Sequence, residues 1–200
     1  MHGVLNGIRV LDFSEYIAGP YAGELLADLG AEVIKVEPPL GDFWRHTTPV
    51  APAESRGFMG VNKGKRSISL DLKHPETREV LERMVRSADV FLANYRPGVA
   101  ARLGVDYETL SAINPRLIYC ENTAFGKRGP YSERAGFDLV SQAMTGIMAF
   151  EGAGGLPHPI ITTSPTDLAA GIFMAYAVAA ALYQREHTGR GQQIETSLFA

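Results

Sequence analysis

The carboxylate of Asp167 stands at the start of a predicted helix, where it could cap the helix or act as a nucleophile. Pro165 and Asp167 precede sixteen uncharged residues, Leu168 to Tyr183, and proline is favoured in the first turn of a helix. A helix from about Pro165 to Glu186 is therefore predicted. An aspartate in its first turn can cap backbone N–H groups, and the same place would keep the carboxylate ionised and nucleophilic. The residues alone favour the capping role and leave the nucleophilic role open.

The histidine, cysteine and glycine residues do not follow the common patterns of metal, thiol and nucleotide sites. The five histidines are scattered without metal-site spacing. The single cysteine, Cys120, lies in an apolar run and is predicted to be a small buried side chain. No Gly-x-Gly-x-x-Gly follows a predicted strand, and Gly-Lys-Ser/Thr is absent. We therefore expect no metal and no tightly bound cofactor.

Composition and charge restrict the classes of partner. Apolar residues make up 46% of the chain, which is ample for a buried core. A net charge of −3 argues against a nucleic-acid binder. The N-terminus lacks the pattern of a signal peptide, and the run from Leu168 to Tyr183 is shorter than the roughly 20 residues of a bilayer span. We expect a cytoplasmic chain with neither nucleic acid nor membrane as partner.

The N-terminal segment predicts a βαβ unit. Ile8 to Phe13 is a short apolar run typical of a strand. A helix follows, with Pro20 in its first turn and Gly30 as its stop. Ala31 to Val36 is a second strand. Strand, helix and strand in so few residues favour a parallel sheet with right-handed crossovers.

Further strands and helices alternate along the rest of the chain. They are predicted as helix Pro75–Ala88, strand Val90–Asn94, helix Tyr107–Ile113, strand Leu117–Glu121, buried helix Phe137–Phe150, helix Pro165–Glu186 and strand Gln192–Phe199. Residues 37–67, rich in proline and glycine, predict a long functional loop, and Gly152–Gly155 a glycine loop. The class is α/β, with a Rossmann-like parallel sheet and flanking helices.

Several segments, in order along nearly the whole chain, resemble the family III CoA-transferases (CaiB/BaiF type). They are GIRVLDFSEYIAGPYAGELLADLGAEVIKVEPP (7–39), NKGKRSISLDLK (62–73), ADVFLANYRPGVAARLG (88–104), NPRLIY (114–119), PTDLAAG (165–171) and HTGRGQQIETSLF (187–199). Each segment is modest alone, but six in register identify the family.

The resemblance implies a transfer of CoA between an acyl-CoA and a carboxylic acid. Asp167 matches the catalytic aspartate of the family, which attacks the thioester to form an anhydride and then an aspartyl-CoA thioester. Coenzyme A would thus be a substrate, and its phosphates and pantetheine arm need cations and apolar walls.

The resemblance also places the CoA contacts. Tyr16 and Ile17 would line the thioester, Asn94 and Tyr95 the pantetheine path, and Arg102 a phosphate. Leu70 and Lys73 would lie near the adenine. The full set of expected CoA-binding positions is Tyr16, Ile17, Leu70, Lys73, Asn94, Tyr95, Arg96, Arg102 and Phe137. Other cations that could meet phosphates, or simply face solvent, are Arg45, Lys63, Lys65, Arg66, Lys127 and Arg128.

Three departures from the family pattern affect these expectations. Some members carry glutamine at the position of Ile17, and certain members carry arginine where this chain has Pro38 and Pro39. The racemase branch uses histidine before aspartate in Gly-His-Asp, whereas this chain has Phe137 there. Phenylalanine cannot exchange a proton, so 2-methylacyl-CoA racemisation is the disfavoured alternative.

Family members are about twice as long as this chain. The resemblance therefore implies a partial large domain at residues 1–186 and, at 187–200, the start of a crossing into a smaller domain, with the small domain and the return segment lacking. The full-length form would be an interlocked homodimer. The isolated chain would be inactive and expose apolar surface. A third reading is a non-catalytic half that binds CoA or serves assembly.

Overall fold

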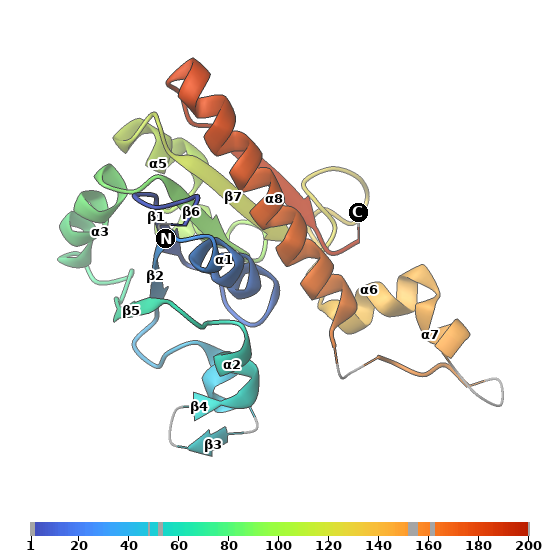
Figure 1. The fold of residues 1–200 in the computed structure, drawn as a ribbon. Helices are drawn as coiled ribbons and strands as arrows, with labels where there is room; N and C mark the ends of the chain where they lie inside the picture. The colour runs from blue at the N-terminus through green and yellow to red at the C-terminus, as the bar shows by residue number, and fades with distance from the viewer. Residues whose placement is uncertain (1–2, 48, 52–53, 152–155, 161–162, 200) are drawn as a thin grey trace.

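The computed structural model describes residues 3–47, 49–51, 54–151, 156–160 and 163–199. Within this part of the chain, six strands form one parallel sheet in the order β5-β2-β1-β6-β7-β8 (Figure 1). Counted along the chain, that is the 3-2-1-4-5-6 order of a doubly wound fold, and it reverses between β1 and β6. The strands are β1 (Arg9–Asp12), β2 (Glu32–Glu37), β5 (Arg66–Ser69), β6 (Val90–Ala93), β7 (Ile118–Thr123) and β8 (Gln193–Ser197).

The central strands are apolar on both faces because helices cover both. Successive strand residues point to opposite faces. Val10 and Val90 are aligned neighbours in a core that includes Met174 of α8 (Pro165–Thr188) and residues of α1 (Ala18–Asp28). Leu11 and Phe91 face a second core, shared with α3 (Thr77–Arg86) and α5 (Tyr107–Ile113). The predicted parallel sheet with flanking helices is confirmed.

Cys120 is fully buried in the first of these cores. Burial raises the pKa of its thiol far above the ordinary range, so it stays protonated at neutral pH. The prediction of a small buried side chain is confirmed.

The predicted long loop at residues 37–67 is only partly correct. It contains a short 3-10 helix, η1 (Phe43–His46), a two-stranded hairpin of β3 (Pro49–Ala51) and β4 (Glu54–Ser55), and α2 (Arg56–Gly60). Arg66 already belongs to edge strand β5, whose four residues are all exposed. Elements this short carry too little periodicity to be predicted. The same applies to α4 (Val99–Leu103).

The predicted single helix from Phe137 to Phe150 is wrong. Two helices, α6 (Asp138–Thr145) and α7 (Ile147–Glu151), meet at Gly146, which has a φ of 81°. A residue in this left-handed conformation ends a helix, and glycine adopts it without strain. Leu139 and Met144 are exposed rather than buried. The glycine loop expected at 152–155 lies outside the described residues.

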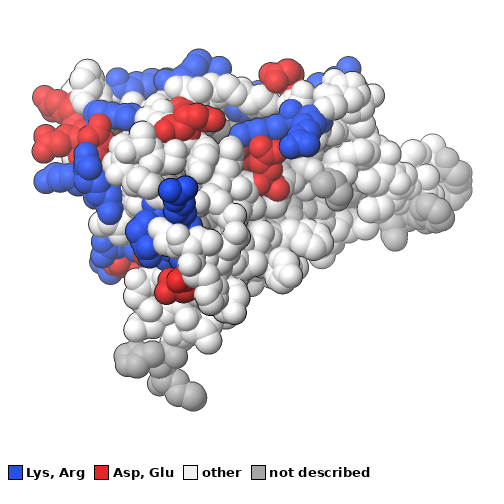
Figure 2. Space-filling model, turned by 90° about the horizontal axis from the view of Figure 1, so that it is seen from above, with Lys and Arg blue, Asp and Glu red and all other residues white. Residues whose placement is uncertain are grey.

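Helix α8 packs one face on α1 and β7 and leaves another face open. Among the described helices it alone has the length and composition of a membrane span, yet Met174 and Val178 on it are completely buried in the protein core. Phe173, Tyr176 and Tyr183 are exposed by 62%, 73% and 71%. The expected exposed apolar surface is therefore present. Figure 2 also shows that Lys, Arg, Asp and Glu are scarce over the projecting end that holds α6 and α7.

Candidate active site

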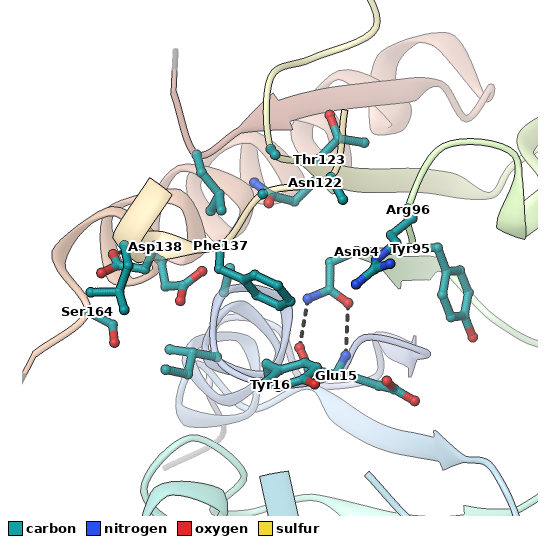
Figure 3. A pocket seen from close by; sticks show the side chains of 18 of the residues that line it. Glu15, Tyr16, Asn94, Tyr95, Arg96, Asn122, Thr123, Phe137, Asp138 and Ser164 are labelled. Atoms are coloured by element: carbon teal, nitrogen blue, oxygen red, sulfur yellow. Dashed lines mark hydrogen bonds between the residues drawn. The ribbon is translucent and has the colours of Figure 1, made fainter. Parts of the chain in front are cut away.

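A cavity of about 520 Å³ opens at the carboxyl ends of β1 and β6. The sheet order reverses between these two strands, and doubly wound folds bind ligands in that crevice. Its walls come from the turn after β1, the segment after β6, the residues before α6 and the first turn of α8 (Figure 3). Of the residues expected at the site, seven line it: Tyr16, Ile17, Asn94, Tyr95, Arg96, Phe137 and Asp167.

Asp167 lies in the first turn of α8, partly covered by the cavity walls. Within the described part of the chain its carboxylate accepts no hydrogen bond, so it does not cap the helix. Burial, followed by the charge of Asp138, raises the pKa of Asp167 to about 7. The expectation that the helix start keeps this group ionised is therefore wrong in direction, because these two effects favour the protonated form.

Asp138, from α6, is the residue that caps α8. One of its carboxylate oxygens accepts hydrogen bonds from the N–H of Thr166 at 2.8 Å, from the Thr166 hydroxyl at 2.6 Å and from the N–H of Asp167 at 3.2 Å. The other oxygen accepts a hydrogen bond from the Gln142 amide. Gln142 also bonds both the C=O and the N–H of Ile160, at 2.9 and 2.8 Å. Sequence reasoning gave Asp138 no role; the Asp138–Gln142 spacing, one helical turn, was the available signal.

The turn after β1 is held in an uncommon conformation. Tyr16 has a φ of 65°, which is costly for a residue with a side chain. Asn94, after β6, accepts a hydrogen bond from the N–H of Glu15 at 2.9 Å and donates one to its C=O at 2.7 Å (Figure 3). The amide of Asn94 thus fixes the turn that presents Tyr16 and Ile17 to the cavity.

The aromatic rings of Tyr16, Trp44 and Phe137 line one side of the cavity. The ring of Tyr16 lies 5.5 Å from that of Phe43, 5.9 Å from Trp44 and 5.9 Å from Phe137. Phe137 is 51% exposed, and its ring lies 6.0 Å from the guanidinium of Arg96. This wall is apolar and carries no proton-exchanging group at position 137, as the sequence indicated.

A buried ion pair stabilises the turn after β1 from the protein interior. Lys35, with 1% of its side chain exposed, pairs with Asp42 at 3.0 Å and donates a hydrogen bond to the C=O of Ser14 at 2.7 Å. Asp42 in turn accepts hydrogen bonds from the N–H of Tyr16 at 3.3 Å and of Trp44 at 2.9 Å. Removing one member of a buried pair leaves an uncompensated charge. Neither Lys35 nor Asp42 lines the cavity, so these groups act by fixing the loop.

Lys65 belongs to this buried support and not to the surface. Its side chain is 2% exposed, and its ammonium group bonds Asp12 at 2.8 Å, the C=O of Pro20 at 2.6 Å and Asn62 at 2.8 Å. Burial lowers the pKa of Lys65, against the opposing effect of Asp12. Lys65 is thus unsuited to meet a ligand phosphate.

The cations at the cavity itself are Arg96 and Arg134, both exposed. Arg134 was not among the expected residues. Leu70, Lys73 and Arg102 do not line the cavity: Leu70 packs on the second core, while Lys73 and Arg102 are exposed. Any ligand that reaches them must extend beyond the cavity mouth.

Gly171 explains how α8 comes close enough to α1 to present Asp167. A Cβ on Gly171 would lie 2.7 Å from the C=O of Ala18 and 3.0 Å from the Tyr21 ring. The first contact is closer than real Cβ atoms come, and the second is tighter than most real Cβ contacts. The absence of a side chain at Gly171 therefore sets the distance between Asp167 and the turn after β1.

Known proteins are similar to this chain in both sequence and fold. The model of CoA-transferase family III matches residues 5–200. Acetyl-CoA:oxalate CoA-transferase of Acetobacter aceti is 45% identical over 199 residues, which cover 98% of this chain and 51% of the relative. Succinate–glutarate CoA-transferase of Agrobacterium fabrum is 41% identical, with 97% and 50% covered.

A solved structure of the same family also matches this chain. The crystal structure of a CAIB/BAIF family protein from Brucella suis superposes with a TM-score of 0.92 at 42% identity, and the match covers 100% of this chain and 54% of that one. The chain thus spans about half the length of the proteins it matches. It belongs to CoA-transferase family III.

Proposed function

We propose that this chain supplies the CoA-binding half and the nucleophile, Asp167, of an enzyme that transfers CoA between an acyl-CoA and a carboxylic acid. The observation that carries the proposal is the Asp167 carboxylate, which accepts no hydrogen bond from the described residues and lies in a cavity at the point where the sheet order reverses. Its helix amides are already occupied by Asp138, so the Asp167 carboxylate is free to react.

The chemistry proceeds through two kinds of covalent intermediate. The Asp167 carboxylate attacks the thioester carbonyl, the C–S bond breaks, and a mixed anhydride and CoA thiolate form. The thiolate then attacks the Asp167 carbonyl of the anhydride, which releases the first acid and leaves an aspartyl-CoA thioester. The acceptor acid repeats these steps in reverse and leaves as the new acyl-CoA. No net proton is gained or lost.

The cavity suits the thioester end of CoA, which is a substrate and not a resident cofactor. In this proposal Tyr16 and Ile17 line the reacting carbonyl, while Asn94, Tyr95 and Phe137 wall the pantetheine arm. Arg96 meets a phosphate, and the nucleotide extends over the surface toward Leu70, Lys73 and Arg102. Cations at one end and apolar walls at the other match the chemistry of CoA.

The acid is proposed to be a dicarboxylic acid. The relatives' names state oxalate, glutarate and L-malate as their acids, and all three carry two carboxylates. Acetyl-CoA or succinyl-CoA is then the donor to test first.

The working enzyme is proposed to be a cytoplasmic homodimer that includes the half of the family length beyond this chain. A site that depends on segments elsewhere is not preorganised without them. The 200-residue chain alone is therefore expected to bind CoA but not to turn it over.

A CoA-exchange assay tests the proposal. Acetyl-CoA or succinyl-CoA is mixed with oxalate, glutarate or malate, and new CoA esters are measured by mass spectrometry. The chain is assayed alone and together with the C-terminal half of a family member, a combination called the completed enzyme from here on. We expect CoA exchange by the completed enzyme. The rate should fall about 10³-fold or more in Asp167→Ala and change little in the control Asp28→Ala, whose side chain is exposed. Equal exchange by Asp167→Ala would overturn the proposal.

A further inference from the structure

Two carboxylates meet at the start of α8, although the transfer chemistry uses only one. Asp138 is 5% exposed and Gln142 is 0% exposed. The first N–H groups of any helix have no partner within the helix and need an acceptor. Ser164, directly before α8, offers no side-chain cap. Asp138 therefore fills a need that the sequence next to α8 does not meet.

We propose that Asp138, held by Gln142, is a positioning residue for Asp167. By accepting the amide hydrogen bonds at the start of α8, it frees both carboxylate oxygens of Asp167 for the substrate. The inference rests on the proposed transfer function, since it assigns Asp138 a part in the same site. Asp138 itself does not touch the reacting atoms.

Gln142 determines how Asp138 is held. The Ile160 N–H donates to the Gln142 carbonyl at 2.8 Å, and the Gln142 amide donates to the Ile160 C=O at 2.9 Å. This pairing fixes the amide so that its N–H also reaches Asp138. Both oxygens of Asp138 are consequently engaged, and the carboxylate cannot rotate away from the first turn of α8.

The charge of Asp138 adds an electrostatic effect to this geometry. Together with burial it raises the pKa of Asp167 to about 7. A carboxylate of higher pKa is a more basic nucleophile once ionised, at the cost of a lower ionised fraction at neutral pH. The other titratable groups that line the cavity are Glu15, Tyr16, Tyr95, Arg96 and Arg134.

Three substitutions separate charge from geometry. Asp138→Asn keeps an acceptor for the α8 amides and removes the charge. Asp138→Glu keeps the charge and displaces the acceptor by one methylene. Asp138→Ala removes both. The matched control is Asp106→Asn, which alters another helix-capping carboxylate, bonded to the N–H of Thr109 at 3.0 Å, but outside the cavity described above.

The primary readout is the titration of Asp167, followed by ¹³C-carboxyl NMR of the 200-residue chain and assigned with Asp167→Asn. In Asp138→Asn the midpoint should fall by about one pH unit or more, and in Asp138→Glu it should stay nearer the wild-type value. Hydrogen exchange at the Thr166 and Asp167 amides should accelerate in Asp138→Ala. Asp106→Asn should change none of these values.

In the completed enzyme, the acid limb of the rate profile should move with the Asp167 midpoint, because only the ionised form attacks. If a folded Asp138→Asn keeps the wild-type midpoint, and Asp138→Ala keeps the wild-type exchange at both amides, the inference is overturned. The NMR readouts need no turnover. An inactive wild-type enzyme would therefore count against the proposed function alone and leave the test of Asp138 intact.

Discussion

Asp138 and Asp167 lie 29 residues apart in the sequence, yet the N–H of Asp167 donates a hydrogen bond to the carboxylate of Asp138 at 3.2 Å. Two acidic side chains are thereby held at one end of α8, one as a cap and the other facing the cavity. The cap is satisfied by hydrogen bonds, whereas the Asp167 carboxylate has none within the described residues. Because Asp138 accepts the hydrogen bonds at the start of α8, the Asp167 carboxylate remains available to react with a substrate.

Asp167 should lower the stability of the protein above its pKa. Its folded-state pKa of about 7 exceeds the ordinary 3.8. Between these two pH values the folded state therefore binds more protons than the unfolded state. Stability then falls as the pH rises through this interval. Asp167→Asn should be more stable than wild type by about 2 to 4 kcal/mol at pH 8, with no difference near pH 3. Urea unfolding across this pH range measures it; an Asn variant equally stable at pH 8 would contradict the buried, charged environment.

Gly171 should not tolerate a side chain. Gly171→Ala places a Cβ against the Ala18 carbonyl and should destabilise by about 1 to 3 kcal/mol through overpacking. The shift of α8 should also reduce transfer by the completed enzyme. Gly60→Ala is the matched control, since its Cβ would meet nothing within 4 Å. Thermal unfolding of both variants checks the prediction, which fails if the two substitutions have the same effect.

The backbone strain at Tyr16 should appear as a difference in stability between two variants of that residue. Both Tyr16→Ala and Tyr16→Gly lose the ring contacts with Phe43 and Trp44. Only glycine adopts a φ of 65° without cost. The glycine variant should be more stable by about 1 kcal/mol, measured by chemical denaturation. A more stable alanine variant would mean that the turn does not hold this backbone conformation in solution.

Lys35 should be essential for stability although it does not line the cavity. Lys35→Met leaves the Asp42 carboxylate buried without its cation and should cost about 3 to 5 kcal/mol. Arg86→Met removes an exposed pair with Glu82 and should cost less than about 0.5 kcal/mol. Denaturation midpoints of the two variants test the contrast. If the two variants lose similar amounts of unfolding free energy, the buried pair contributes no more to stability than the exposed one.

The sequence was sufficient to predict those parts of the fold that are set by local periodicity. The helix Tyr107–Ile113 was predicted at its observed bounds, and the parallel sheet followed from the βαβ pattern. The sequence also pointed to seven of the cavity residues, through the family resemblance.

What could not be predicted depends on contacts between distant segments. The cap that Asp138 provides to α8 requires the two helices to be placed first. Lys65 looked like a surface cation until the fold buried it beside Asp12. The break between α6 and α7 follows from the positive φ of Gly146. Glycine permits this conformation, but the presence of a glycine in the sequence does not predict it.

The most direct test of the account is a search for the covalent intermediate at Asp167. The completed enzyme is incubated with acyl-CoA, quenched with hydroxylamine and digested, and the peptide that contains Asp167 is examined by mass spectrometry. We predict a hydroxamate at Asp167 that appears only when acyl-CoA is present, and no hydroxamate on the corresponding peptide of Asp167→Ala. An enzyme that exchanges CoA at full rate while Asp167 remains unmodified would contradict it.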